Sequence, residues 1–444
     1  MKKNLLKLWL CGFALTVSGG LFAQTDLANV INYGLKHSHD VKKSDFQNLE
    51  AKYLKREVIG NGLPQIEGSA GYSKMMLPGG LDLPESIFQM VPEEYAGMLE
   101  GISGLDELNS MSVGVQVTQL IYSQAFWVGL KTAKKTQEMY KVMQDKTEED
   151  IISDIANTYY QIGLLMLQKN TVTKSAENLK EVYQMTELKY QSDLVKETDL
   201  NRLKVRITNL EVTNTQIENS IQMQLNYLKV ISGMPLDSNL VIKPTADLSF
   251  KDPNLSFNVE DVPAFQVMLK QNEIYGLQVK KEKANYYPTL AAYGKLDYST
   301  YTTEDNYDTW TNLNTVGLNL TIPIFYSGSD YAKVKQAKYK QSQLQEDIEK
   351  TRDMLTIQYN NAILDYKTAQ RLLAEEKENR DLAERVYEQT ELQYNEGLAS
   401  MADLLNVNSD LLSADNSYNQ QMLKCKTAEI KILETSGRLK LLLN

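Results

Sequence analysis

The chain contains the same stretch of sequence twice, 204 residues apart. Residues 181–200 read EVYQMTELKYQSDLVKETDL and residues 385–404 read RVYEQTELQYNEGLASMADL, with nine of twenty positions identical. The same spacing brings Ser232-Gly233 to Ser436-Gly437 further along the chain. An ungapped match over roughly a hundred residues indicates a duplicated structural unit, so the fold of one unit must occur twice.

The first 23 residues have the features of a secretory signal peptide. Three lysines precede an apolar stretch over residues 8–17, and small residues lead to a cleavage position after Ala23. The apolar stretch is too short to span a bilayer, which disfavours a membrane anchor. We therefore expect residues 1–23 to be removed when the protein is exported.

The remaining composition excludes several classes of function. Beyond the signal peptide there are 44 basic and 57 acidic residues, and this negative charge disfavours nucleic acid as a partner. Cys425 is the single cysteine left, and His37 and His39 are the only histidines, which disfavours a disulfide, a histidine-built metal site and a catalytic triad. No phosphate-binding loop, dinucleotide motif or nucleophile elbow is found either. We predict a protein that is not an enzyme and carries no cofactor.

Two long tracts are free of helix breakers. Residues 93–234 and 324–444 contain no proline, and Gly397 is the only glycine between Gly328 and Gly437. Apolar residues recur at heptad spacing in both tracts, as in helices that pack side by side. The pattern predicts helices at about 125–192 and 329–396, each roughly 100 Å long at 1.5 Å per residue. Each is followed by a turn, near 191–197 and 395–400, and by a returning helix.

Before each long helix the hydrophobic period changes from 3.6 to 2. Strands are predicted at about 63–74, 111–122, 288–300 and 314–325. Alternation of apolar and small polar residues is a weak signal of membrane β-barrel strands, and an ordinary half-buried hairpin is the alternative. Aromatic residues gather where strand meets helix and at the far end of the second hairpin, which favours two membrane interfaces. We then expect the apolar side chains of Val316, Leu318 and Leu320 to face lipid. Their neighbours Thr315, Gly317 and Asn319 should face a lumen.

The repeats divide the mature chain. The first repeat spans residues 24–233, an irregular linker spans 234–262, and the second repeat spans 263–444. The loop 75–110 of the first hairpin is long and rich in Met, Leu and Gly. No role is predicted for that loop.

The order helix, hairpin, long helix, helix, occurring twice behind a signal peptide, resembles the TolC-like outer-membrane efflux protein family. The most specific match is at the turns, where family members carry Tyr-x-x-Gly-x with an Asp six residues after the Gly. Here this reads Tyr394, Gly397 and Asp403 in the second repeat. The first repeat holds a degenerate copy in which Asp193 replaces the glycine, and Asp tolerates a left-handed turn better than most residues.

The resemblance implies an α+β fold in which three chains give four strands each to one twelve-stranded outer-membrane β-barrel, surrounded by outer-membrane lipid. A long periplasmic α-helical barrel would continue it. Such a homotrimer is a passive exit duct of a tripartite efflux or type I secretion system, opened by a periplasmic adaptor protein and an inner-membrane pump of the RND, ABC or MFS class. General physics supports part of this. Four strands cannot close a barrel, and the smallest bacterial outer-membrane barrel has eight. The number three is implied by the resemblance alone.

The resemblance also assigns roles at the turns. Three residues are expected to form closing contacts of a gate: Asp199, Tyr394 and Asp403. Three others are expected to be the surface that an adaptor reads: Leu194, Gly397 and Leu398. Relatives use an Arg for closure at the position of Ala399, so the latch here is either weaker or made otherwise, through Lys196 or Arg202.

The alternative class is a soluble periplasmic coiled-coil adaptor or structural rod. Such a protein would share the heptads and the signal peptide. It would not need four barrel-like strands duplicated at a fixed spacing, and it would be extracted without detergent. The sequence names neither the cargo nor the pump.

Overall fold

The computed structural model of the protein describes residues 26–76, 84–88, 107–242, 256–302 and 310–443. The predicted signal peptide, most of the loop 75–110 and the centre of the 234–262 linker lie outside the described residues. Within the described part of the chain, no helix has both the length and the apolarity needed to cross a membrane.

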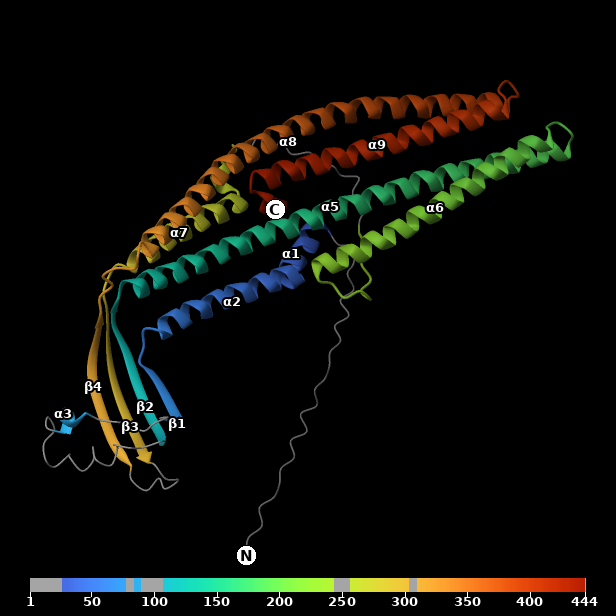
Figure 1. Cartoon of the computed structure of the whole chain (residues 1–444). Helices are drawn as coiled ribbons and strands as arrows, with labels where there is room; N and C mark the ends of the chain where they lie inside the picture. The colour runs from blue at the N-terminus through green and yellow to red at the C-terminus, as the bar shows by residue number, and fades with distance from the viewer. Residues whose placement is uncertain (1–25, 77–83, 89–106, 243–255, 303–309, 444) are drawn as a thin grey trace, which may run out of the picture. The chain divides into compact units, whose positions relative to one another are not determined.

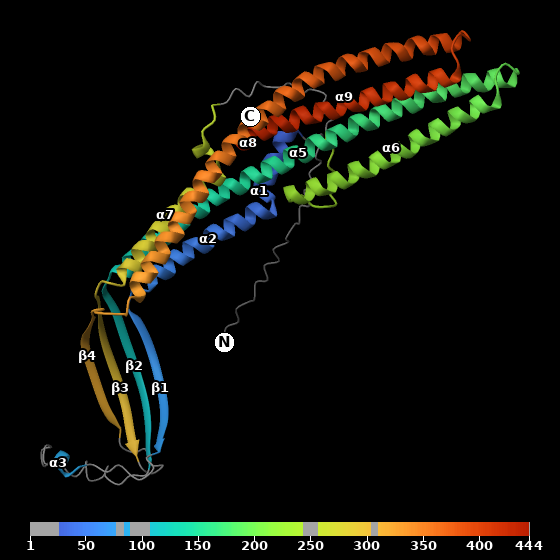
Figure 2. The ribbon, with the colours of Figure 1, turned by 45° about the horizontal axis from the view of Figure 1, so that its top comes forward.

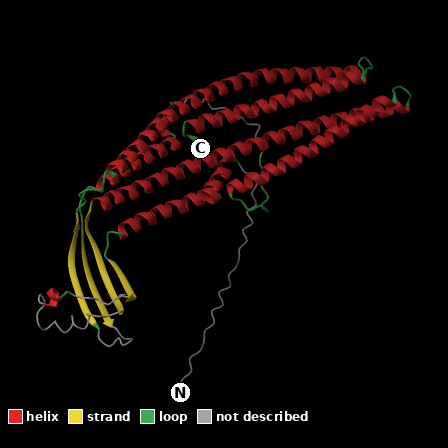
Figure 3. Ribbon diagram, in the orientation of Figure 1, coloured by secondary structure: helices red, strands yellow, loops and turns green. Residues whose placement is uncertain are grey.

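The described strands form one antiparallel sheet in the order β1-β2-β3-β4 (Figure 3). Their bounds are Gln65–Met76 for β1, Glu107–Ser123 for β2, Thr289–Thr302 for β3 and Thr311–Thr321 for β4. β2 and β3 come from different repeats and pair with each other, so the two predicted hairpins become a single sheet. The predicted last strand, 314–325, is wrong at its end, because β4 stops at Thr321. Pro323 lacks the N–H that a strand ladder needs.

The two faces of the sheet differ in polarity. The pairing places Val115 beside Leu296, Val117 beside Gly294, and Gly294 beside Val316, so these positions share one face. The alternation along β4 keeps Leu318 and Leu320 on that face too. The opposite face has small and polar residues: Gln116, Thr315, Gly317 and Asn319. It also has an ion pair, in which Lys295 Nζ lies 3.3 Å from Asp297 Oδ1. The apolar face is solvent-exposed in a single chain, and exposed apolar surface of this kind marks an interaction site.

Close packing on the polar face depends on glycine. Tyr293 lies directly opposite Gly317, and a Cβ at Gly317 would approach the Tyr293 ring to 2.8 Å. Asp297 likewise lies opposite Gly114, where a Cβ would lie 2.6 Å from Asp297 Oδ1. Both β3 side chains therefore lean along the sheet over a neighbouring glycine.

The helices agree with the breaker-free tracts. α5 spans Gln124–Gln191 and α8 spans Ser329–Asn395, and α6 (Glu197–Ser232) and α9 (Met401–Thr435) return from them. α5 has 68 residues, which at 1.5 Å per residue is about 100 Å. Figures 1 and 2 show α6 running beside α5 and α9 beside α8 up to a tight turn.

Shorter elements complete the described fold: α1 (Leu27–His37), α2 (His39–Gly60), α3 (Glu85–Phe88), η1 (Val259–Asp261), α7 (Pro263–Ala284) and η2 (Leu439–Leu443). α1 packs into the largest apolar cluster, where Val30 and Ile31 are buried with Ile152 and Ile155 of α5 and Leu228 of α6. Burying such a side chain contributes about 1.5–3 kcal/mol. This cluster therefore anchors α1 to the middle of the helical hairpin.

The compact units of the chain do not coincide with the two repeats. One, which we call the tip unit, comprises Met1–Phe46, Val142–Gln266 and Lys350–Asn444; the other, the sheet unit, comprises Gln47–Lys141 and Val267–Glu349. Each long helix passes through both units. The division at 24–233, 234–262 and 263–444 thus describes the sequence repeats, whereas packing joins corresponding parts of both repeats.

The linker predicted at 234–262 is partly buried at its described ends, 234–242 and 256–262. Met234, Leu240 and Ile242 belong to the same apolar cluster as α1, and Val262 is also buried. These contacts fix the connection between the repeats.

In the sheet unit, charged side chains link α7 to the start of α5. Lys135 Nζ lies 2.8 Å from a carboxylate oxygen of Glu138 and 2.8 Å from one of Glu273, and Lys270 contacts both acids. Hydrogen bonds from Lys135 lower the pKa of Glu138 and of Glu273. These exposed pairs contribute little stability each, but as a network they fix the register of the two helices.

The polarity of the two faces leads to a test. Leu318→Arg places a charge on the apolar face and should cost roughly 2–4 kcal/mol if that face contacts lipid near the bilayer midplane. Asn319→Arg, one residue along on the polar face, is the matched control. The temperature at which each variant loses its sheet signal in circular dichroism, measured in detergent, compares the two. Equal melting of both variants would contradict the assignment of the faces.

Candidate functional site

Each long helix ends in the same hydrogen-bonded turn. The N–H of Leu194 donates to the carbonyl of Lys189 at 2.9 Å, and the N–H of Leu398 donates to that of Gln393 at 2.7 Å. Such bonds, spanning six residues, define the Schellman motif that closes a helix. We call the two turns the first tip (192–196) and the second tip (396–400).

The residue before each leucine has a left-handed backbone conformation. Gly397 has φ of +77°, as the sequence predicts for the turn glycine, and Asp193 has φ of +56°. No atom lies within 4 Å of a Cβ built on Gly397. The glycine is therefore needed for its backbone conformation and not for space.

The leucines of the tips are unusually exposed for this motif. Leu194 is 74% exposed and Leu398 is 76% exposed. The same motif ends α6, where Gly233 has φ of +70° and the N–H of Met234 donates to the carbonyl of Lys229. There the apolar residue is 5% exposed, in line with the packing that usually accompanies the motif. The tips therefore expose the apolar side chain that is buried at the end of α6.

Behind the turns, an apolar cluster joins the hairpin of the first repeat to that of the second. Tyr394 of α8 is buried in it, and its hydroxyl lies 3.0 Å from Thr186 Oγ1 of α5. Lys189 Nζ lies 5.1 Å from the centre of the Tyr394 ring, within range of a cation–π interaction. The Thr186–Tyr394 hydrogen bond thus ties the ends of the two long helices together.

Asp199 is close enough to this contact to act on it electrostatically. Burial raises the pKa of the Tyr394 hydroxyl, and the negative charge of Asp199 raises it further. The tyrosine therefore remains protonated at neutral pH and is able to donate a hydrogen bond. The sequence predicts that Asp199 and Tyr394 lie close together, and in the structure the charge of Asp199 acts on the Tyr394 hydroxyl.

Asp403 has a different environment. Its backbone N–H donates to Ser400 Oγ at 3.2 Å, while its carboxylate accepts from the Ser400 N–H at 3.1 Å and from the hydroxyl at 2.6 Å. This reciprocal arrangement is a capping box that starts α9. The hydrogen bonds from Ser400 lower the pKa of the Asp403 carboxyl. The structure does not bring Asp403 to the Tyr394 contact but gives it a role within its own helix.

The first tip lacks this cap. Asp199 occupies the position of α6 that Asp403 occupies in α9, but the N-cap residue is Lys196, whose side chain makes no capping hydrogen bond. The acidic side chain of Asp199 is therefore not held by its own helix terminus. The duplicated tips have the same turn, but the matching aspartates that follow have different surroundings.

The structure also shows where Ala399, which stands at the position of the relatives' arginine, and its possible substitutes Lys196 and Arg202 lie. Ala399 packs against the tip cluster. Lys196 is exposed, and Arg202 lines a groove with Arg206 and Leu405. Among the residues that the structure describes, neither Lys196 nor Arg202 forms an ion pair with a tip carboxylate within one chain.

Sequence reasoning missed Thr186 and Ser400. Thr186 is identical in both repeats, as Thr186 and Thr390, and this identity was a signal for its role. Ser400 and Asp403 form the Ser-x-x-Asp pattern of a capping box, which was also readable from the sequence.

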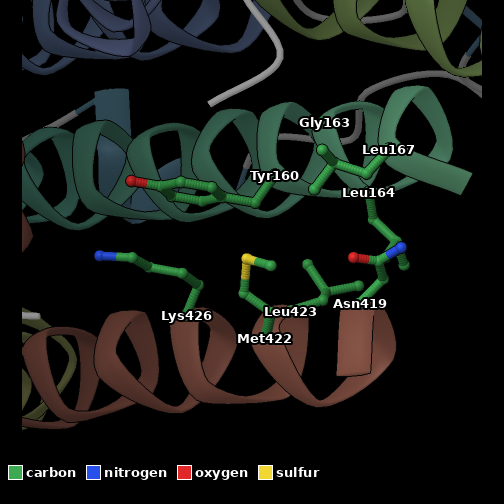
Figure 4. A pocket seen from close by; sticks show the side chains of 8 residues that line it. All are labelled: Tyr160, Gly163, Leu164, Leu167, Asn419, Met422, Leu423 and Lys426. Carbon is green, nitrogen blue, oxygen red and sulfur yellow. The ribbon is translucent and has the colours of Figure 1, made fainter. Parts of the chain in front are cut away.

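The small cavity between α5 and α9 is no alternative ligand site. Its volume is about 20 Å³, which suits a single water molecule. Figure 4 shows Tyr160 and Gly163 of α5 opposite Met422 and Lys426 of α9. The Lys426 ammonium lies 2.9 Å from Glu429, and burial raises the pKa of Tyr160 to about 12. The cavity is a gap in helix packing beside a glycine.

Comparison with protein families and curated sequences gives consistent results. The family model described as outer membrane efflux protein matches residues 261–438. Outer membrane protein TolC of Vibrio cholerae is 23% identical over 257 residues, 55% of this chain and 57% of that protein. Alkaline protease secretion protein AprF of Pseudomonas aeruginosa is 21% identical over 292 residues, 62% of this chain and 59% of that protein. The chain spans between half and two thirds of the length of these curated relatives.

Solved structures are similar over nearly the whole chain. The Campylobacter jejuni CmeC outer membrane channel superposes with a TM-score of 0.76 at 17% identity, covering 98% of this chain and 94% of that one. The open state of the Neisseria gonorrhoeae MtrE outer membrane channel gives 0.69 at 14% identity, covering 93% and 88%. At these identities the likeness is one of fold.

The unequal caps of the two tips lead to a prediction. Lys196→Ser restores the capping-box pattern with Asp199 and should stabilise the start of α6 by about 0.5–2 kcal/mol. The carboxylate of Asp199 should then bond to its own helix terminus and leave the Tyr394 contact. Thermal unfolding measured by circular dichroism, with Lys204→Ser inside α6 as control, should show a higher midpoint only for the tip variant. A lower midpoint would show that Lys196 has an attractive contact that the cap does not replace.

Proposed function

We propose that this chain, whose residues 261–438 match the model of the outer membrane efflux protein family, is a member of that family and forms the outer-membrane exit duct of an export system. The duct is a passive conduit that continues as a helical tube in the periplasm. It serves a tripartite efflux or type I secretion machine and needs no catalytic residue or cofactor of its own.

The observation that carries the proposal is the sheet with one apolar face, one polar face and two uncovered edges. In the described chain, β1 and β4 each have an edge that pairs with no strand. Unpaired backbone groups cannot face lipid, since hydrocarbon offers them no hydrogen bonds. The edges must therefore pair with other chains, and the apolar face then meets lipid while the polar face lines the lumen.

The number of chains follows from closure and from the family. Four strands from one chain are half of the smallest bacterial outer-membrane barrel, so at least two copies are required. The family implies three copies and a twelve-stranded barrel. The duplication also supports a closed tube, because each chain contributes two helical hairpins of the same design.

The tips are proposed to be the gate and the docking surface. Asp199 and Tyr394 keep the helix ends together in the closed state, with the Thr186 hydroxyl as their partner. Asp403 holds the start of α9 and so sets the position of the second tip. Leu194 and Leu398 are the apolar residues that a periplasmic adaptor contacts, and Gly397 gives the second tip the shape of this surface.

The partners follow from this arrangement. A periplasmic adaptor protein couples the tips to an inner-membrane pump of the RND, ABC or MFS class. Two of the curated relatives are named as protease secretion proteins, which favours a peptide or protein cargo as one candidate. Small-molecule efflux is the other.

Cell fractionation with mass measurement tests the proposed function. The protein should occur in the outer membrane, require detergent for extraction and behave as a trimer that dissociates on heating. In planar lipid bilayers the purified protein should form channels. Recovery from the periplasm without detergent, or a stable monomer in detergent, would favour the soluble rod or adaptor.

The gate and the docking surface are tested separately. Asp199→Ala removes the acid from the Tyr394 contact and should increase resting conductance in bilayers. The double change Leu194→Asp and Leu398→Asp should leave conductance unchanged and abolish export in cells, because only docking is affected. Val212→Asp, an exposed position further along α6, is the control. Normal export by the double variant at normal protein level would remove the tips from docking.

A further inference from the structure

The helix segments that adjoin the sheet are strongly basic, although the chain as a whole is acidic. The formal net charge of the chain is −10, yet these segments together hold 13 basic and 3 acidic residues. All of them belong to the sheet unit, and Figure 1 shows that α2, α5, α7 and α8 meet the strands at one end of the sheet. We call this group the basic collar, and its segments are 51–60 of α2, 124–135 of α5, 275–284 of α7 and 329–340 of α8.

Helix dipoles do not account for the basic collar. Cations stabilise the last turn of a helix, and this explains Lys281 and Lys283 at the end of α7. α5 and α8, however, begin at the sheet, and their lysines start at Lys131 and Lys333, beyond the first turn of each helix. Because the dipole acts only within the first and last turns, the lysines of these two helices have another cause.

Three lysines of the basic collar line one groove between α7 and α8. Lys281 comes from α7, whereas Lys333 and Lys340 come from α8. The groove has a volume of about 1040 Å³, and the acid among its described lining residues is Glu282, whose carboxylate already accepts hydrogen bonds from two neighbouring side chains. Lys333 Nζ lies 3.2 Å from Asp330 Oδ1, but Lys281 and Lys340 form no ion pair with any residue that the structure describes. The groove therefore has positive charge that its surroundings do not neutralise.

A second groove connects these lysines to aromatic side chains at the junction of strand and helix. Lys333 lines it as well, together with Tyr287, Phe325 and Tyr326. All three rings are more than half exposed. Exposed aromatic rings at the ends of membrane strands lie at the level of the lipid headgroups. At that level the phosphate groups of a leaflet come within reach of the neighbouring lysines.

The positive charge is confined to one level along the long helices. Beyond the basic collar, residues 136–150 of α5 hold five acidic and two basic residues, and residues 341–353 of α8 hold four acidic and two basic residues. An anionic membrane surface attracts basic residues only within about a Debye length, roughly 10 Å. A short basic segment followed by acidic residues therefore fits a membrane surface better than it fits an anionic polymer that extends along the helices.

We propose that the groove lined by Lys281, Lys333 and Lys340 binds the headgroup of an anionic phospholipid in the leaflet on the helical side of the membrane. Phosphate oxygens accept hydrogen bonds from the lysine ammonium groups, and the acyl chains pass the aromatic rings into the hydrocarbon. The inference rests on the proposed function, because it requires the sheet to lie in a membrane, and it adds the class of lipid that the groove selects.

Binding of defined lipids to the detergent-solubilised protein tests the inference. Phosphatidylglycerol, which is anionic, and phosphatidylcholine, which has no net charge, are each titrated in mixed micelles, and bound lipid is counted by native mass spectrometry. The wild type should bind phosphatidylglycerol at the lower concentration, and this preference should weaken as salt is raised. Lys281→Gln with Lys340→Gln should raise the apparent dissociation constant for phosphatidylglycerol about 25-fold, at roughly fivefold per lysine.

Two matched pairs of substitutions serve as controls. Lys281→Arg with Lys340→Arg keeps the charge of the groove and should keep the binding. Lys204→Gln with Lys367→Gln removes the same charge from exposed positions of the tip unit and should bind phosphatidylglycerol as the wild type does. Equal binding of phosphatidylglycerol by the wild type and by the protein with Lys281→Gln and Lys340→Gln would overturn the inference.

Three other occupants of the groove predict different results, and each of these results overturns the inference. A site for soluble anions would lose its lipid to inorganic phosphate more readily than to sodium chloride of the same ionic strength. A site for a cell-wall polymer would hold the wild type on purified peptidoglycan but show no preference for phosphatidylglycerol. An interface between copies would lose the oligomer with Lys281→Gln and Lys340→Gln and keep it with Lys204→Gln and Lys367→Gln.

Failure of this inference and failure of the proposed function give different results. Recovery of the wild type from the periplasm without detergent would overturn the proposed function, and the lipid site with it. A wild type that is extracted from the outer membrane as an oligomer but binds the two lipids equally would overturn this inference alone.

Discussion

The structure depends on a sheet that one chain cannot complete. β1 and β4 leave backbone donors and acceptors along two edges, and the apolar face of the sheet exposes Val316, Leu318 and Leu320. In water such edges invite aggregation, and in hydrocarbon they are not tolerated. In the proposed assembly, further copies pair with the edges and lipid covers the apolar face. The proposed assembly and membrane environment therefore both answer one unmet hydrogen-bonding requirement.

The long helices connect the strands to the tips along the chain. α5 begins directly after β2, and neither α5 nor α8 contains a proline, so each continues for about 100 Å without a helix breaker. The two hairpins are held together near the tips by the buried cluster around Tyr394. The gate proposed for the tips would have to open this cluster.

The duplicated tips differ at one helix cap. Both keep the Schellman turn and the exposed leucine, which are properties of the backbone and of the surface. Only the second keeps the capping serine, and Lys196 in the first leaves Asp199 available to the neighbouring tyrosine. The two turns are thus alike, whereas the N-cap residue decides whether the aspartate three positions later is held by its own helix.

The sequence alone determined the element types, the repeat and the turn at Gly397. Breaker-free tracts, period-2 alternation and a lone glycine are local signals, and they predict helices, strands and a positive φ without knowledge of neighbours. Only the tertiary structure decided that β2 pairs with β3, that Thr186 meets Tyr394 and that the compact units cut across the repeats. These facts depend on which faces of distant segments meet. The identities of Asp199 and Asp403 were equally visible in the sequence, but only the structure shows that Ser400 binds the carboxylate of Asp403 and that the N-cap residue Lys196 makes no capping bond near Asp199.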